Sequence, residues 1–527
     1  MRAVSLTLTA ALLAAPAAAE TLTILHTNDF HSRIEPISKY NSGCSEEDNA
    51  AGECFGGSAR LITAVRAARA ATNNSLLVDG GDQFQGSLFY TYYKGQAAAE
   101  MMNAIGYAAM TVGNHEFDDG PEVLRGFMDA VDFPVLMSNA DISEEPALAG
   151  VLMPSTIVER GGERIGLIGL TPEDTHQMSK SGEHVHFHDP VEAVRREIAK
   201  LEAEGITRII VLSHSGYRVD QRIAAEVDGI DVMVGGHTNT YLSNTSDKAE
   251  GPYPTWVTNP GGGRTAIVHA FAFGKFLGRL DVTFDENGVV TEAIGEPILI
   301  DGEVAEDSSL KDRIAELAKP LDELRNKVVA ETAAGIDGDR GSCRARECQM
   351  GNLVADALVD RAKGQGVTMA IVNGGGLRAS IDAGPITMGE VLTVLPFQNV
   401  LSTFGLKGAD IVAALEHGVS KVEDGAGQFP QVSGLRFALD LSVAPGEGRV
   451  SKVEVPEGDG WGEIDPDKVY LVATSNFLRT GGDGYDMFAN KAVDAYDGGP
   501  SIEDLVVEYL IDGGKYQPYI DGRITLK

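Results

Sequence analysis

The sequence predicts an α/β protein of layered sheets and helices, and three observations support this fold class. From Thr21 to about Gly302, short apolar runs alternate with helical patterns. These runs are rich in β-branched residues and lack polar alternation, which is typical of strands buried on both faces of a sheet. From about Glu331, a second region combines a helix with two strands, each of which runs into a Gly-rich loop. The length of 527 residues allows two to four domains of this kind.

The first residues have the pattern of an export signal. A short basic start precedes an apolar run from Leu6 to Ala15, and small residues before Glu20 form a cleavage site. The run is too short to span a bilayer, and the C-terminus has no hydrophobic tail that would direct lipid anchoring. We therefore expect a signal peptide over 1–19, cleaved after Ala19, and a periplasmic or extracellular protein without a membrane anchor.

Strands and helices of the first domain follow the signal. The predicted strands are 22–25, 75–78, 165–168, 209–212 and 230–234. His26, directly after the first strand, is interpreted as a buried structural histidine. A helical pattern then begins at the cap residues 307–309. Its apolar positions are Leu310, Ile314, Leu317, Leu321 and Leu324.

The helical pattern contains Pro320, so we expect a kink or two consecutive helices there. It is interpreted as an amphipathic connector between two domains, and the alternative is a packed helix of the first domain. The second domain is predicted to contain a helix over 349–363 and strands over 368–372 and 469–474. The expected boundaries are 20–305 for the first domain, 306–330 for the helical linker and 331–527 for the second domain.

Charge and cysteine content narrow the function classes. The chain has 43 Lys and Arg against 77 Asp and Glu, which gives a formal net charge of −34. Such a chain repels nucleic-acid backbones, so we expect no nucleic-acid partner. Four cysteines in an exported chain suggest two disulfides. They form two local pairs, Cys44 with Cys54 and Cys343 with Cys348, and local closure is the simplest of three possible connectivities.

Five short polar motifs stand at or just after the ends of predicted strands, where ligands collect in layered α/β folds. They are 29–31, 80–82, 113–118, 213–215 and 236–239. Because alternate residues of an extended segment point the same way, Asp29 and His31 can face one ion, as can His237 and Asn239. Carboxylates, imidazoles and an amide without Cys suit Zn²⁺, Mn²⁺, Fe²⁺ or Co²⁺. Two metals need a bridging carboxylate, for which Asp82 is the candidate.

This ordered series resembles the calcineurin-like metallophosphatase family, and the two-domain layout is similar to the 5′-nucleotidase family. The resemblance covers nearly all of the mature chain. It implies a four-layer α/β/β/α N-terminal domain, a helical connector and an α/β substrate-binding C-terminal domain. It also implies one metal on Asp29, His31, Asp82 and Asn239, a second on Asp82, Asn114, His214 and His237, and a catalytic dyad of His115 and Asp118.

The second domain supplies a further set of motifs that resembles the nucleotide-binding half of 5′-nucleotidases. The local matches are 343–352, 373–378 and 477–483. The resemblance implies that Phe397 and Phe477 stack the nucleobase, that Asp483 binds the ribose hydroxyls, that Asn373 contacts base or ribose, and that Arg344 and Arg378 hold phosphate. Read from the residues alone, each of these could also be a core or turn position.

The function that follows is hydrolysis of nucleoside 5′-monophosphates such as AMP by hydroxide activated between two divalent ions, Zn, Mn or Co. His115, kept cationic by Asp118, would stabilise developing charge or protonate the leaving alkoxide. Within the same class, the alternatives are a UDP-sugar hydrolase and a 2′,3′-cyclic-nucleotide phosphodiesterase/3′-nucleotidase. From another class, the alternative is a non-catalytic nucleotide-binding scavenging protein. Monomer and homodimer are both compatible with the sequence.

Overall fold

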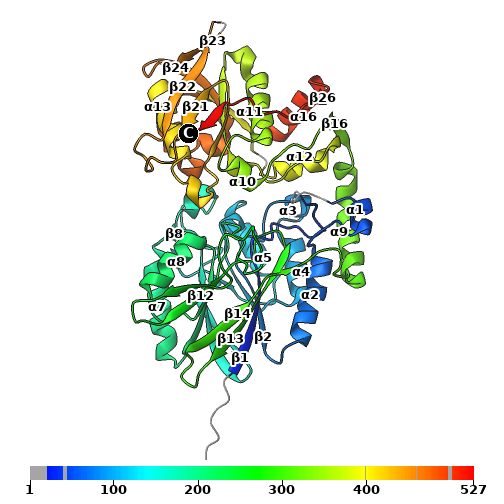
Figure 1. Cartoon of the computed structure of the whole chain (residues 1–527), viewed down its shortest axis with the longest axis vertical. Helices are drawn as coiled ribbons and strands as arrows, with labels where there is room; N and C mark the ends of the chain where they lie inside the picture. The colour runs from blue at the N-terminus through cyan, green and yellow to red at the C-terminus, as the bar shows by residue number, and fades with distance from the viewer. Residues whose placement is uncertain (1–19, 40–43, 398, 459, 497–500) are drawn as a thin grey trace, which may run out of the picture.

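The computed structural model describes residues 20–39, 44–397, 399–458, 460–496 and 501–527. The predicted signal peptide, 1–19, lies outside the described residues. Two domains are stacked along the long axis of the molecule, the N-terminal one below the C-terminal one in Figure 1. Among the helices of the described part of the chain, none is both long and apolar enough to cross a membrane.

Two sheets form the centre of the N-terminal domain. The first contains, in spatial order, β14 (Val290–Gly295), β13 (Phe276–Phe284), β1 (Glu20–Thr27), β2 (Ser75–Asp79), β3 (Ala109–Thr111) and β4 (Val135–Leu136), with β15 (Ile298–Leu299) also paired to β13. The second contains β11 (Thr255–Thr258), β12 (Arg264–Val268), β10 (Val232–Val234), β9 (Arg208–Ser213), β7 (Glu163–Leu170) and β6 (Ser155–Arg160). The predicted strands are all present in these two sheets.

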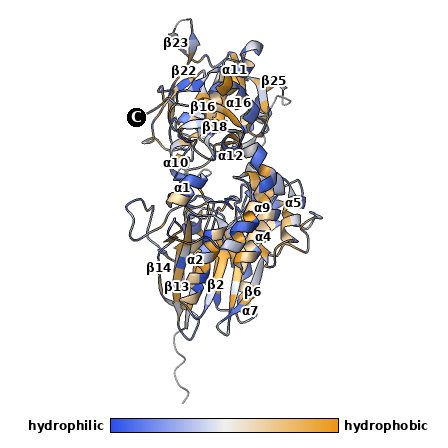
Figure 2. Ribbon diagram, turned by 90° about the vertical axis from the view of Figure 1, so that its right-hand side faces the viewer, coloured by the Kyte–Doolittle hydropathy of each residue, from blue (hydrophilic) through white to orange (hydrophobic). Residues whose placement is uncertain are grey.

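The two sheets face each other, and helices cover their outer faces. Ile24 of β1 packs in the core between the sheets, whereas its neighbour Leu25 packs in the core beneath the helices. The first sheet is covered by α2 (Ser58–Ala70), α4 (Gln96–Ile105) and α5 (Pro121–Met128), and the second by α7 (Pro190–Ala203) and α8 (Tyr217–Glu226). Apolar strands between more polar helices are visible in Figure 2. The predicted four-layer α/β/β/α order is confirmed.

Helix α9 (Ser308–Arg325) follows the N-terminal domain as one helix that runs through Pro320. Of the two expected forms, a kink or two consecutive helices, the second is therefore wrong. Pro320 is exposed, so the carbonyl of Glu316, which it cannot bond, lies on the solvent side of the helix. Among the side chains of α9 that the structure describes, those buried in the core of the N-terminal domain are Leu310, Ile314, Leu317, Ala318 and Leu321. The side chain of Leu324, also predicted as an apolar contact, lies outside the described part. The helix thus packs on the N-terminal domain and leads along the chain to the C-terminal domain.

The C-terminal domain is built on a mixed sheet with further strands at its side. The mixed sheet has the order β20 (Pro430–Ser433), β17 (Met369–Asn373), β24 (Val469–Ser475), β19 (Leu401–Lys407) and β25 (Val493–Tyr496). A second sheet has the order β23 (Gly460–Glu463), β22 (Val450–Glu457), β21 (Arg436–Leu439) and β27 (Ile524–Leu526), and a third has β18 (Gly384–Thr387), β16 (Val328–Thr332) and β26 (Lys515–Tyr516).

Helices cover both faces of the mixed sheet. α11 (Gln349–Ala362) and α16 (Ile502–Asp512) pack on one face, and α13 (Gly408–Gly418) packs on the other. The short helices α10 (Arg340–Cys343), α12 (Met388–Val394), α14 (Asn476–Arg479) and α15 (Asp486–Lys491) complete the domain. In Figure 1, α10 and α12 lie at the boundary with the lower domain.

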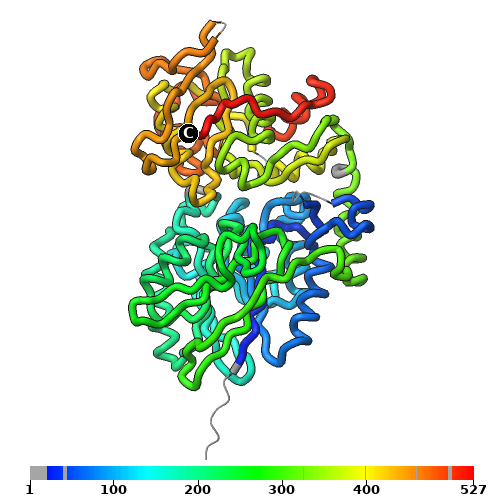
Figure 3. The backbone as a smooth tube through the Cα atoms, viewed as in Figure 1, coloured from blue at the N-terminus to red at the C-terminus, as the bar shows by residue number. Residues whose placement is uncertain are grey.

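The domains touch at separate places along their boundary. Figure 3 shows the chain passing from the lower to the upper domain beyond α9. Elsewhere, Lys421 Nζ lies 3.3 Å from Asp174 Oδ2, and Arg218 pairs with Asp424. Both pairs are substantially exposed, so each contributes at most about 1 kcal/mol to closure. Both predicted disulfides are confirmed: Cys44 bonds to Cys54, and Cys343 bonds to Cys348.

Candidate active site

Five of the seven predicted metal ligands lie in loops that leave the ends of β1, β2 and β10 with left-handed backbone, whereas Asn114 follows β3 and His214 follows β9. The φ angles are 50° at Asp29, 49° at His31, 61° at Asp82, 71° at His237 and 53° at Asn239. The expectation that alternation along an extended segment aligns these side chains is therefore wrong. A left-handed non-glycine residue costs roughly 1–2 kcal/mol, so the surrounding structure must hold each of these loops in place.

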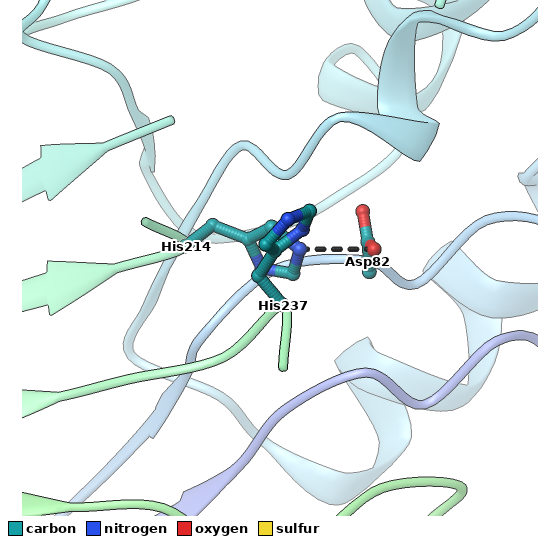
Figure 4. A group of neighbouring side chains, drawn as sticks. All are labelled: Asp82, His214 and His237. Atoms are coloured by element: carbon teal, nitrogen blue, oxygen red, sulfur yellow. Dashed lines mark ion pairs between the residues drawn. The ribbon is translucent and has the colours of Figure 1, made fainter. Parts of the chain in front are cut away.

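The loops bring the predicted ligands into two overlapping groups. Donor atoms of Asp29, His31 and Asp82 all lie within 4.8 Å of one another, and so do those of Asp82, His214 and His237. Asp82 belongs to both groups. Figure 4 shows Asp82 facing the imidazoles of His214 and His237, and Asp82 Oδ2 is 2.9 Å from His214 Nε2. A carboxylate shared by two ligand groups is the arrangement expected of a bridging ligand.

The two asparagines predicted as ligands also lie here. Asn114 Oδ1 is 2.9 Å from His237 Nδ1. Asn239 is 5% exposed, and its Oδ1 has no hydrogen-bond partner among the described residues. An amide oxygen buried without a partner costs about 1–3 kcal/mol. A cation or a water on a cation would satisfy this oxygen.

Backbone carbonyls orient two of the imidazoles. His31 Nδ1 donates to Phe84 O at 2.9 Å, and His214 Nδ1 donates to Gly80 O at 2.6 Å. Since a carbonyl only accepts, each Nδ1 carries a proton and each Nε2 faces the carboxylates, as metal-binding histidines require. Burial, followed by the charge of Arg378, lowers the pKa of His31 well below its ordinary value, which keeps its ring neutral.

The pKa of His214 is shifted in the opposite direction. Burial lowers its pKa, but the carboxylates of Asp82 and Asp29 outweigh burial and raise it to about 10. A proton on Nε2 must therefore leave when a cation binds, so cation affinity rises with pH. The donor set of carboxylates, imidazoles and amides, without a thiolate, fits a hard or borderline divalent cation.

His115 and Asp118 are adjacent to these groups. His115 is the first residue of η1 (His115–Phe117), and its Nδ1 donates to Asp118 Oδ2 at 2.6 Å. The other oxygen of Asp118 accepts the hydroxyl of Ser179 at 2.7 Å. Burial lowers the pKa of His115, but Asp118 and Asp82 together raise it above its ordinary value. The pair can thus hold a proton on an imidazole that is directed at the site.

Glu116, between the two members of that pair, has a role that the sequence did not reveal. Its carboxylate accepts the backbone N–H groups of Asp82, Gln83, Phe84 and Gly113, at 3.0, 2.8, 3.1 and 2.6 Å. Glu116 is 0% exposed. One buried side chain therefore ties the loop after β2 to the loop after β3. Its place inside a run of ligand residues was the only available signal.

Arginines of the C-terminal domain reach the same site. Arg378 Nη2 donates to His31 Nε2 at 3.0 Å, and Arg340 Nη2 donates to His237 O at 2.8 Å. Both arginines and Arg344 line a pocket that also includes Asn239. Burial, followed by Arg340 and Arg378, lowers the pKa of Arg344 well below its ordinary value. The three positively charged guanidinium groups repel one another, and an anion bound in this pocket would offset their repulsion. Arg340 was missed, because no motif distinguishes it from a surface arginine.

The remaining predicted residues lie in the C-terminal domain. Asn373 Nδ2 donates to Asp483 Oδ2 at 2.6 Å, and burial raises the pKa of the Asp483 carboxyl. A Cβ on Gly482 would lie 2.5 Å from the ring of Phe477, so this glycine lets the ring pack against the loop of Asp483. Phe397 stacks on His115, with ring centroids 5.5 Å apart. The disulfide Cys343–Cys348 closes the loop that carries Arg344.

Comparisons with known proteins agree with this geometry. A family model described as calcineurin-like phosphoesterase matches residues 22–241, and one described as 5′-nucleotidase, C-terminal domain, matches residues 328–490. The snake venom 5′-nucleotidase of Naja atra is 38% identical over 96% of this chain and 98% of its own. The 5′-nucleotidase of Homo sapiens is 38% identical over 95% and 90%. The crystal structure of the 5′-nucleotidase precursor from Thermus thermophilus has a TM-score of 0.91, with 40% identity over 96% of this chain and 99% of that chain.

The resemblance drawn from the motifs is confirmed by these matches, which extend over both domains. Membership of the calcineurin-like phosphoesterases implies divalent metal ions, and the two carboxylate–histidine groups around Asp82 fit them. The chain therefore belongs to the 5′-nucleotidase family.

Proposed function

We propose that this protein is a metal-dependent phosphohydrolase that converts nucleoside 5′-monophosphates such as AMP to nucleoside and phosphate. The observation that carries the proposal is the position of Asp82. Its carboxylate belongs to both ligand groups, and its Oδ1 accepts the backbone N–H of His115 at 2.9 Å. The site for cations and the acid–base pair are thus connected through Asp82. The signal-like start of the chain further supports an exported enzyme.

Two divalent ions are part of the proposal. Asp29, His31, Asp82 and Asn239 would hold one, and Asp82, Asn114, His214 and His237 would hold the other. Zn, Mn and Co all suit this donor set. When bound, such ions lower the pKa of water toward neutrality and neutralise charge on phosphate oxygens.

The residues of the chain divide the remaining work. His115, oriented by Asp118, donates a proton toward the leaving oxygen of the ribose. Arg344 and Arg378 approach from the second domain and bind phosphate oxygens by paired N–H donors. Phe397 and Phe477 stack the base, and Asp483, fixed by Asn373, accepts from the ribose hydroxyls. Closure of the domains over the phosphate excludes bulk water.

Phosphate release from a substrate panel tests the proposal. The panel is AMP, UDP-glucose and 2′,3′-cyclic AMP, assayed before chelation, after chelation and after add-back of Zn²⁺, Mn²⁺ or Co²⁺. We expect release from AMP that disappears with the chelator and returns with metal, and no release by folded Asp82→Ala. Binding of AMP without phosphate release under any metal would instead identify a scavenging protein.

A specific observation favours hydrolysis of UDP-sugars as a second activity. Arg340 adds a third guanidinium to the pocket lined by Arg344 and Arg378. A substrate with two phosphates would give this third guanidinium a second phosphate to bind. The ratio of rates on UDP-glucose and AMP measures this second activity.

A further inference from the structure

The two segments that carry Phe397 and Phe477 are joined directly at Asn476. The backbone N–H of Asn476 donates to Val400 O at 2.9 Å, and the backbone N–H of Val400 donates to Asn476 Oδ1 at 3.0 Å. Asn476 is the first residue of α14, and Val400 lies three residues beyond Phe397. These two bonds connect the start of α14 to the loop before β19.

The α14 side of this connection is held firmly. Ser475 caps the helix by accepting the N–H of Leu478 at 3.2 Å. Leu478 is 0% exposed, and the ring of Phe477 packs on Gly482. The position of Phe477 is therefore set by its own helix and by the glycine beneath it.

On the Phe397 side, the ring stacks on His115 and the guanidinium of Arg378 lies over it. A cavity of about 30 Å³ lies beside it, lined by Leu395, Phe397, Asn399 and Ser475 among others. Because the loop borders a void, packing alone does not fix where it lies. A further backbone anchor is the N–H of Ile502, which donates to Asn399 O at 2.9 Å. The bond from Val400 to the Asn476 side chain is thus one of the contacts that place the loop, and the one that joins it to the segment of Phe477.

We propose that Asn476 is a positioning residue that sets the separation of the two phenylalanine rings and thereby the preference for substrates with a planar base. This inference rests on the proposed function. Contact between ring carbons is best at about 3.5–4.0 Å, so a base between two rings needs them about 7–8 Å apart. A gap of 0.5–1 Å forfeits about a quarter to a half of the contact energy. The free energy of base stacking, about 1–3 kcal/mol, would fall by the same fraction.

The test compares AMP with ribose 5-phosphate, which has the same leaving group and no base. Asn476→Ala removes the side-chain acceptor and keeps the backbone bond to Val400 O. We expect its KM for AMP to rise about 3- to 10-fold, with kcat on AMP and both constants for ribose 5-phosphate within about twofold of wild type. Asn476→Asp keeps an acceptor and should restore the KM for AMP. Asn490→Ala, the same substitution at an exposed position of α15, is the matched control.

Three results would overturn the inference: an unchanged KM for AMP in Asn476→Ala, equal losses on both substrates, or failure of Asn476→Asp to rescue. The double variant Phe397→Ala, Phe477→Ala separates these failures from failure of the proposed function. If it weakens AMP hydrolysis more than ribose 5-phosphate hydrolysis, base stacking stands and only the role of Asn476 is rejected. If it weakens both equally, the stacking on which the inference rests is itself rejected. Thermal unfolding of each variant identifies a general loss of folding.

Discussion

The carboxylate of Glu116 accepts the backbone N–H of Asp82 at 3.0 Å, so the proposed bridging ligand is held by a residue that offers no atom to a cation. The same carboxylate also accepts the N–H of Gly113, directly before Asn114. Loops from two neighbouring strands are thereby joined under the site. Left-handed backbone at Asp82 persists because this carboxylate fixes the loop around it.

Replacement of Glu116 should therefore disturb the loops that carry the proposed metal ligands. Glu116→Ala leaves four buried N–H groups without an acceptor, each worth about 1–3 kcal/mol. We expect a clear loss of thermal stability and a fall of at least about tenfold in metal-dependent phosphate release. Glu116→Gln keeps acceptor capacity on one oxygen. Its thermal stability and its rate of phosphate release should therefore lie between those of wild type and Glu116→Ala. Calorimetry of metal binding tests whether activity falls because the site binds metal less tightly. Wild-type metal affinity in Glu116→Ala would contradict this cause.

The sequence was sufficient for the strands and for the residue types at their ends, because buried strands leave continuous apolar runs that the polar motifs directly follow. It was not sufficient for the backbone of those motifs. Left-handed φ at Asp29 and His31 depends on hydrogen bonds to a distant loop, such as His31 N–H to Asp82 O at 3.0 Å. Arg340 was missed for a related reason, since its partner, the carbonyl of His237, belongs to the other domain.

Asp118 should act through His115 alone. In Asp118→Asn the 2.6 Å contact to Nδ1 loses its charge, so the imidazole is held less firmly as a cation. We expect kcat on AMP to fall about 100-fold or more. On p-nitrophenyl phosphate, whose leaving group needs little protonation, the fall should be far smaller. Ser179→Ala, which removes the bond to the other oxygen of Asp118, is the control and should have a mild effect. Equal losses on both substrates would assign the pair a different role.

Arg340 should contribute more to the hydrolysis of substrates with two phosphates than to that of substrates with one. Arg340→Ala removes one of three guanidiniums from the pocket and its bond to His237 O. We expect kcat/KM for UDP-glucose to fall about tenfold more than that for AMP, the worth of one charge-assisted hydrogen bond. Arg340→Lys keeps the positive charge but lacks the paired N–H donors of the guanidinium, so it should recover part of the lost kcat/KM. If AMP and UDP-glucose lose equally, Arg340 serves closure of the domains and not a second phosphate.

Rotation between the domains is a further prediction, because the proposed metal ligands and base pocket lie on different domains. Arg218 and Asp424 are exposed partners across the boundary, so Arg218→Cys with Asp424→Cys permits bridging by a bifunctional maleimide. The bridged enzyme should keep single-turnover cleavage of bound AMP and lose multiple turnover about tenfold or more. Bridging Glu100→Cys to Arg313→Cys, within the N-terminal domain, is the matched control. Unaffected multiple turnover would argue against gating by rotation.

His26 should make stability depend on pH in a defined window. It is 0% exposed, with Nε2 2.8 Å from the hydroxyl of Tyr253, and burial, followed by His269, lowers its pKa to about 3. The ordinary pKa of 6.5 applies to the unfolded chain. The unfolded chain therefore takes up a proton below pH 6.5 while the folded chain does not, and stability falls as pH falls through this window by about 1.4 kcal/mol per unit.

At about pH 5 this loss amounts to about 2 kcal/mol relative to about pH 7.5. The amide of His26→Gln can still bond to Tyr253 but takes up no proton. We therefore expect the difference in unfolding free energy between these two pH values to shrink by about that amount in the variant. His186→Gln, on the exposed strand β8 (His186–Phe187), is the control and should keep the wild-type dependence. Because the wild-type loss comes from the unfolded chain, an equal pH dependence in His26→Gln and wild type would show that His26 is protonated in the folded protein as well.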